Sequence, residues 1–137
     1  MTLFLLHDLQ HSGHLAQARS NAYQKREQQS LVRLQRLPAR TYLQEYDLLF
    51  RYVSRWLLNR GYELTGKQPH QVLARVCEQF ACRTQIAEMI RCRHELKYHG
   101  APISESAMRV LQSLIQHFKS EGAFPTTETP VRGRLNG

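Results

Sequence analysis

Cysteine is scarce in this sequence, and the three residues present do not form an obvious framework. Cys77, Cys82 and Cys92 are an odd set without paired short spacing. This pattern excludes a disulfide scaffold and predicts a reducing, cytoplasmic location. A metal site can be drawn from Cys82, Cys92 and His94, but we favour small buried hydrophobic residues on helices. No metal and no cofactor are therefore expected.

Long apolar runs are also missing. No stretch approaches the ~20 apolar residues that cross a bilayer, so no membrane association is expected. The apolar residues 1–6 are too few, and lack the basic flank, for a signal peptide. The sequence has no internal repeat, glycine-rich phosphate loop, paired CxxC or nucleophile elbow, which excludes the enzyme classes that those motifs mark.

Negative charge is the third shortage. The 137 residues carry 19 Lys and Arg against 11 Asp and Glu, a formal net charge of +8. Such a balance favours a polyanionic partner such as nucleic acid, and arginine in particular suits phosphate contacts. A solvated basic surface with no specific partner is the alternative. The length corresponds to one domain that can bury a core without staples.

Helical periodicity dominates the rest of the chain. Apolar residues recur at three and four positions, most clearly in a segment bounded by Thr41 and Gly61, which are good helix-capping residues. We predict an all-α, up-and-down bundle of four to five helices with an extended N-terminal helix. We divide the chain into a segment 1–13, one helical domain 14–122 and a flexible tail 123–137. The expected helices span about 14–37, 41–60, 70–82, 84–99 and 104–122, with a loop at 62–69.

Three histidines stand near the N-terminus at helical spacing. His7, His11 and His14 are separated by four and three residues, which would place them on one helical face. This is a metal-ligand spacing, and a zinc site is one possible interpretation. We favour a solvated turn because Ser12 and Gly13 interrupt the segment.

The chemistry concentrates in residues 91–100, with sequence RCRHELKYHG. Arg93 and His99 are six positions apart, or roughly 120° around a helix, so one straight helix cannot point both at one atom. Gly100 predicts the helix end, and two copies of the helix meeting across a dimer axis would bring an Arg and a His together. A permanent cation can hold a phosphate while an imidazole moves protons. Glu95 is spaced either to orient His99 or to pair with Arg91.

The run Arg93-His94, four residues and His99 resembles the motif of HEPN domains, and the order of elements over about residues 40–120 is similar to that of the family. The resemblance implies a homodimer whose shared cleft cuts RNA without a metal, through attack by the ribose 2′-hydroxyl. It implies His99 as general acid or base, Arg93 at the scissile phosphate and His94 as polar helper. It also implies a toxin, defence or stress component with a protein antitoxin or regulatory partner. Weaker RNA contacts are assigned to Arg91, Lys97 and Arg55.

One position departs from that pattern. Nucleotidyltransferase-regulated HEPN toxins carry a tyrosine two residues after the motif histidine, whereas this chain has Ala101 there and Tyr98 before the histidine. Two alternatives stay open: a non-catalytic dimerising module that binds nucleic acid or a partner protein, and a structural bundle whose Arg93 and His99 pair with Glu95 and Glu88. His70 could look into the groove of His99, but we favour a structural role for it.

Overall fold

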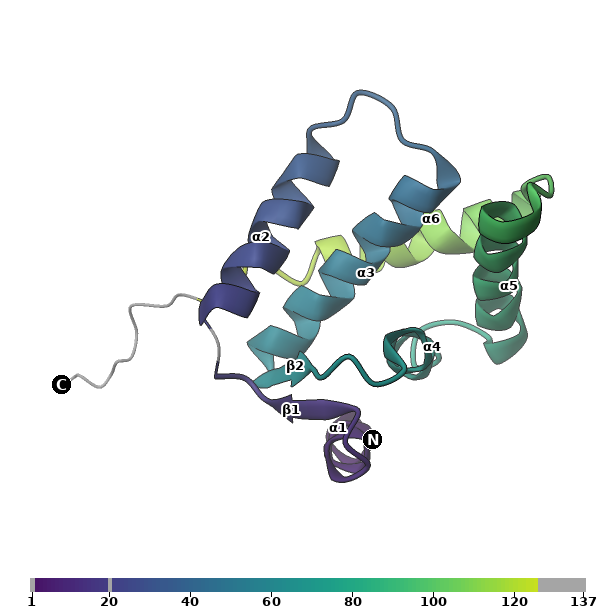
Figure 1. Cartoon of the computed structure of the whole chain (residues 1–137). Helices are drawn as coiled ribbons and strands as arrows, with labels where there is room; N and C mark the ends of the chain where they lie inside the picture. The colour runs from purple at the N-terminus through teal and green to yellow at the C-terminus, as the bar shows by residue number, and fades with distance from the viewer. Residues whose placement is uncertain (1, 20, 126–137) are drawn as a thin grey trace, which may run out of the picture.

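Helix α3 (Tyr42–Asn59) is the centre of the fold (Figure 1). Its N-terminus carries a capping box, in which the Thr41 hydroxyl accepts from the Gln44 N–H and the Gln44 side chain accepts from the Thr41 N–H. Gly61, with φ of +89°, follows its C-terminal end. Both ends predicted from the sequence are confirmed. The helix is buried on most sides because α2, α5 and α6 all pack against it.

The computed structural model describes residues 2–19 and 21–125, with side chains from residue 4 onward. This part of the chain forms a helical bundle with one short antiparallel ribbon, in agreement with the predicted all-α class. No helix within it has the length and apolar character needed to cross a membrane. Most of the predicted tail, residues 126–137, lies outside the described residues. Besides α3, the elements are α1 (Thr2–His11), β1 (Leu15–Gln17), α2 (Asn21–Gln35), β2 (Tyr62–Leu64), α4 (Pro69–Cys77), α5 (Arg83–His99) and α6 (Glu105–Lys119).

The N-terminal region differs from the prediction. The long helix expected from His14 begins only at Asn21, because residues 15–17 pair as β1 with β2, a segment expected to be loop. Leu15 lies opposite Leu64 and is buried, so a contact distant in sequence outweighs local helix propensity. Residues 2–11 form helix α1 rather than a solvated turn, since Leu6 and Leu9 reach the core.

The C-terminal half follows the prediction more closely. Ser104 caps α6 by accepting from the Ala107 N–H at 3.2 Å, and Gly100 ends α5 with φ of +64°. Helix α4 ends earlier than expected, at Cys77, and α5 begins at Arg83 rather than after Thr84. In Figure 1, α2 lies beside α3, α6 passes behind it, and α4 and α5 lie on the side of α3 away from α2.

Candidate functional site

Helix α5 divides into a packed half, residues 83–92, and a free half, residues 93–99. Its buried residues are Ile86, Met89 and Cys92, and none of the residues from Arg93 to His99 is buried. The Tyr42 hydroxyl donates to the Met89 carbonyl at 2.7 Å, which anchors the packed half to α3. The free half is mostly polar, and of its residues only Leu96, which is partly buried, packs against the core. The segment that the sequence singled out is therefore anchored to α3 at one end, and most of its remaining side chains reach solvent.

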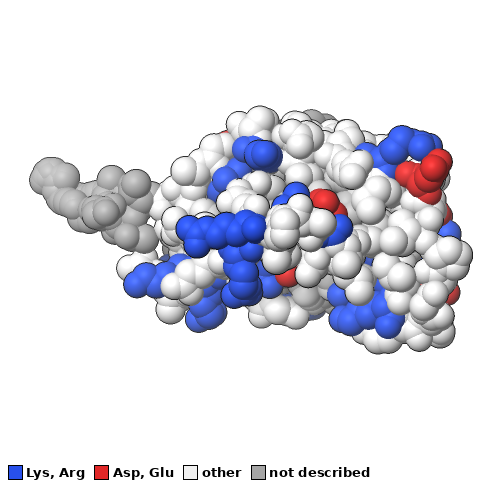
Figure 2. Space-filling model, turned by 90° about the horizontal axis from the view of Figure 1, so that it is seen from above, with Lys and Arg blue, Asp and Glu red and all other residues white. Residues whose placement is uncertain are grey.

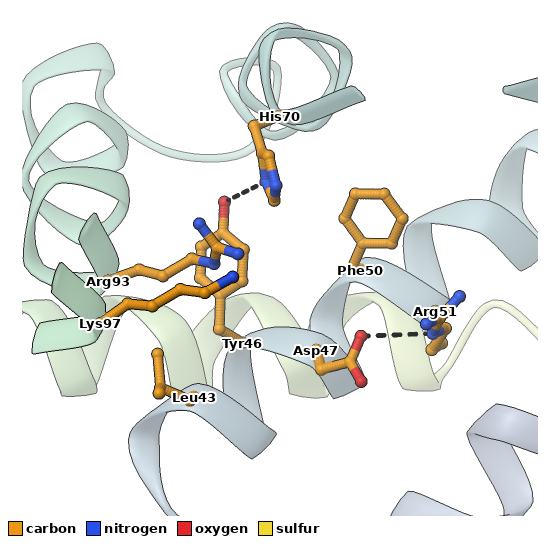
Figure 3. Close-up of a pocket in the computed structure, with 8 residues that line it drawn as sticks. All are labelled: Leu43, Tyr46, Asp47, Phe50, Arg51, His70, Arg93 and Lys97. Carbon is orange, nitrogen blue, oxygen red and sulfur yellow. Dashed lines mark hydrogen bonds and ion pairs between the residues drawn. The ribbon is translucent and has the colours of Figure 1, made fainter. Parts of the chain in front are cut away.

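A pocket of about 370 Å³ lies between the free half of α5, the first turn of α4 and one face of α3 (Figure 3). Arg93 and Lys97 both enter it because residues four apart share one side of a helix. The Arg93 guanidinium lies over the Tyr46 ring, 5.1 Å from its centroid. The remaining lining residues are Leu43, Tyr46, Asp47, Phe50, Arg51 and His70.

His70 faces the two cations from the opposite wall. Its position follows from the start of α4, where Pro69 occupies the first turn and Gln68 before it has a left-handed backbone. The His70 Nδ1 and the Tyr46 hydroxyl share a hydrogen bond of 3.1 Å, and the imidazole also lies 5.6 Å from the Phe50 ring. The sequence favoured a structural role for His70 over a place in the groove of His99. The structure places it with Arg93 and Lys97 instead.

The protonation states of the pocket follow from burial. Burial lowers the pKa of His70, and the nearby Arg93 and Lys97 charges lower it further, so the imidazole is neutral at pH 7. Burial also raises the pKa of Tyr46, which keeps its hydroxyl protonated. A neutral imidazole beside a phenol can accept a proton near neutral pH.

The cations of the pocket are unequally compensated. Arg51 donates to Glu27 at 2.7 Å and pairs with Asp47 at 3.2 Å. By contrast, Arg93 and Lys97 form no ion pair with any described residue. Two uncompensated cations on an apolar and aromatic wall attract an anion, and a guanidinium can bind phosphate through two hydrogen bonds.

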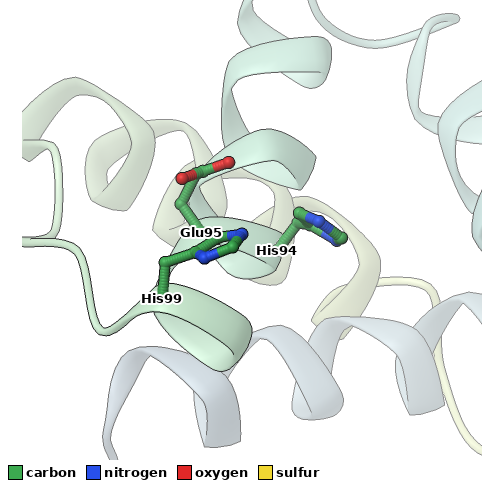
Figure 4. Close-up of side chains that lie close together, drawn as sticks. All are labelled: His94, Glu95 and His99. Carbon is green, nitrogen blue, oxygen red and sulfur yellow. The ribbon is translucent and has the colours of Figure 1, made fainter.

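A second group of side chains lies on the outside of the last turns of α5 (Figure 4). The ligand atoms of His94, Glu95 and His99 all lie within 4.8 Å of one another. Both histidines are exposed and Glu95 is half-buried. Arg91 does not pair with Glu95, because its guanidinium binds Glu88 at 2.7 Å. Glu95 was considered either to orient His99 or to pair with Arg91. It makes no ion pair with Arg91, and its carboxylate lies within 4.8 Å of a ring nitrogen of His99.

Comparisons with known proteins add no relative. A scan against family models, a search of curated proteins and a search of solved structures each found no match to this chain. A function for it must therefore be argued from the site itself.

Among the weaker candidate contacts, Arg55 requires correction. Only 7% of this residue is exposed, and its guanidinium donates to the Phe118 and Lys119 carbonyls at the end of α6. It occupies the interior because those last-turn carbonyls lack helical partners. Arg91 is exposed but paired with Glu88, whereas Lys97 is exposed and lines the pocket. Of the three, only Lys97 lies beside Arg93 in an unpaired state.

The earlier metal possibilities do not assemble. Cys92 is buried, whereas Cys82 is exposed at the start of α5, and neither lies in a group of potential ligands. The His14 ring bonds the Ser12 hydroxyl and the Gln68 side chain. Within residues 2–19 and 21–125, the only cluster of three or more His, Cys, Asp or Glu donors is His94, Glu95 and His99.

Positive charge is also found away from the pocket. The outer face of α2 forms a shallow groove lined by Lys25, Gln28, Gln29, Val32, Arg33 and Arg36. Figure 2 shows Lys and Arg in several separate patches on one face of the molecule, with few acidic residues among them. The basic residues are therefore spread over the surface. In the pocket at α5, two of them, Arg93 and Lys97, lie near the titratable His70.

Proposed function

We propose that this protein is a metal-independent endoribonuclease of the HEPN type that acts as a homodimer. The observation that carries the proposal is the free half of α5. It places two uncompensated cations, Arg93 and Lys97, in a pocket with neutral His70, and places His94 and His99 on the adjacent exposed surface. These are the residue types that phosphodiester cleavage requires.

RNA supplies its own nucleophile in this chemistry. The ribose 2′-hydroxyl loses its proton and attacks phosphorus, the bond from phosphorus to the 5′-oxygen breaks, and that oxygen takes up a proton. The products are a 2′,3′-cyclic phosphate and a 5′-hydroxyl. Arg93, aided by Lys97, stabilises the charge on the phosphoryl oxygens. His99 transfers a proton as general acid or base, with His94 as the polar helper.

A dimer resolves the geometry of Arg93 and His99. The two residues lie roughly 120° apart around α5, so Arg93 enters the pocket while His99 faces away from it. If two α5 helices face each other across a two-fold axis, His99 of one copy approaches the Arg93 pocket of the other. The lack of buried residues beyond Cys92 and the 60% exposure of Tyr98 leave surface for that contact.

Cleavage of mixed cellular RNA in EDTA is the direct test. Wild type is expected to produce fragments ending in 2′,3′-cyclic phosphate, and His99→Ala and Arg93→Ala are each expected to lose at least about 100-fold in rate. Arg83→Ala is the matched control, because Arg83 is an exposed arginine in the first turn of the same helix. Equal losses in the Arg83 and Arg93 variants would contradict the proposal.

Mixing two inactive variants tests whether the site is shared. In a heterodimer of Arg93→Ala and His99→Ala subunits, one of the two composite sites keeps both residues. Random exchange should therefore restore about a quarter of wild-type activity. A site contained within one subunit predicts no recovery, because neither variant chain then keeps both Arg93 and His99.

A non-catalytic module that binds RNA or a partner protein is the second candidate. The pocket favours it independently of His99, because Arg93 and Lys97 can hold a phosphate without any proton transfer. This candidate predicts no cleavage by wild type in any RNA pool, with binding that weakens steeply as salt increases. His99→Ala would then bind RNA as wild type does.

A further inference from the structure

We propose that His94, Glu95 and His99 form a binding site for a divalent transition-metal ion, and the donor set favours Zn²⁺. A metal ion bound there occupies His99 and thereby stops RNA cleavage. The binding site is inferred from geometry alone. Its inhibitory effect rests on the function proposed above.

The three donors are already gathered on one short stretch of helix. Their ligand atoms lie within 4.8 Å of one another (Figure 4). Donors of a tetrahedral zinc site lie about 3.4 Å apart, since each is about 2.0–2.2 Å from the ion. Rotation of the side chains can shorten the separations of the donor atoms to this value, because both histidines are exposed and no core residue packs against them.

These donors are also free to bind. No side chain among the three makes a hydrogen bond or an ion pair with another described residue, and the His94 ring lies 4.8 and 6.1 Å from the Tyr98 and His99 rings, centroid to centroid. Glu95 is half-buried and makes no ion pair, because the Arg91 guanidinium binds Glu88 directly and is attracted to the Glu95 carboxylate only from farther away. A metal ion would place a positive charge directly on this carboxylate without breaking a side-chain hydrogen bond or an ion pair of the three residues.

The electrostatic field at the three donors has one part that favours binding of a cation and one part that opposes it. The site lies at the C-terminal end of α5, where the unpaired carbonyls carry partial negative charge that attracts a cation. Arg93 and Lys97 are the nearest opposing charges in sequence, but both line the pocket with Tyr46 and His70, and the Lys97 ammonium also lies 5.5 Å from the centroid of the Tyr98 ring. The overall charge of +8 weakens binding further.

The donor set selects the class of metal. Two imidazoles and one carboxylate suit Zn²⁺ and its neighbours in the transition series, whereas Mg²⁺ and Ca²⁺ prefer oxygen ligands. Three protein ligands leave an open coordination position. The lone pair of the imidazole that binds the metal can no longer accept a proton, so metal binding and proton transfer by His99 exclude each other.

Metal binding is tested first, without RNA. Zinc titration by calorimetry and Co²⁺ absorption on the metal-free protein should show one strong site per chain, and His94→Ala, Glu95→Gln and His99→Ala should each weaken it by roughly tenfold or more. The control is the double variant His7→Ala, His11→Ala, because both of these histidines are exposed on α1. Binding lost equally in the control, or unchanged in the three variants, would overturn the site. Circular dichroism melts confirm that each variant is folded.

Inhibition is tested second, with each protein compared with its own rate in EDTA. One equivalent of Zn²⁺ should stop cleavage by wild type, EDTA should restore it, and Glu95→Gln should need roughly tenfold more zinc for the same fractional inhibition. Zinc that binds at the three residues without slowing cleavage would overturn the regulatory effect. If wild type fails to cut RNA even in EDTA, the endoribonuclease proposal fails and the metal site is judged by the binding data alone.

Discussion

Helices α3 and α5 have nearly the same length, 18 and 17 residues, yet they are used in opposite ways. Eleven residues of α3 are buried, against three in α5. Helix α3 is surrounded by packed neighbours, whereas α5 has no fully buried residue after Cys92 and only the partly buried Leu96 of its later turns packs against the core. The difference teaches that two helices of similar length have separate roles in the packing: α3 holds the bundle together, and α5 leaves most of its polar half exposed.

Truncating one aromatic side chain on each helix is the strongest test of that separation. Trp56 is fully buried on α3, with edge contacts to the Phe118 and Phe80 rings, so Trp56→Ala should lower the free energy of unfolding by about 3–5 kcal/mol. Tyr98→Ala on α5 should change it by no more than about 0.5 kcal/mol, because the ring is 60% exposed. Urea denaturation measures both. A Tyr98 loss as large as that of Trp56 would show that the free half of α5 is part of the core.

Two cationic side chains sharpen the comparison further. Arg55→Met keeps most of the side-chain volume but leaves the Phe118 and Lys119 carbonyls without their donor, so it should cost about 1.5–3 kcal/mol of stability. Lys97→Met should cost almost nothing in stability but weaken RNA binding, and reduce the slope of log affinity against log salt by about one.

Denaturation and RNA titration over a range of salt concentrations check these effects together. Folded Arg55→Met should bind RNA as wild type does, because Arg55 is buried. An RNA defect in this variant without any loss of stability would contradict the assignment of Arg55 to the core.

The smallest expected effect is the pH dependence that comes from His70. Its pKa in the folded protein is below the ordinary value of about 6.5, so below that pH the unfolded chain binds the proton first and stability falls. His70→Gln removes this contribution. The variant should therefore lose less stability than wild type between about pH 7.5 and 5.5.

Urea unfolding at a series of pH values measures this difference, with His11→Gln as the control for the loss of one exposed histidine. Identical pH profiles for wild type and His70→Gln would mean that Arg93, Lys97 and Tyr46 do not surround the imidazole as described.

Local sequence signals predicted the features that depend on neighbouring residues. The ends of α3 at Thr41 and Gly61, the cap of α6 at Ser104 and the end of α5 at Gly100 all depend on contacts within a few positions. The separation of Arg93 from His99 around α5 follows from helical geometry alone. The pairing of β1 with β2 and the burial of Arg55 depend on segments distant in the chain, and local patterns carry no signal for them.

The sequence by itself determined the helical class, the basic charge, and the segment in which cations and histidines concentrate, because these depend on composition and on the 3.6-residue period. Only the tertiary structure decided which histidine meets which cation. Packing of α4 and α5 against α3 brings His70 to Arg93 and Lys97 across 23 to 27 positions of sequence, and leaves His94, Glu95 and His99 outside. The core determines this placement of the histidines, because the buried side chains of α3 set where the other helices pack.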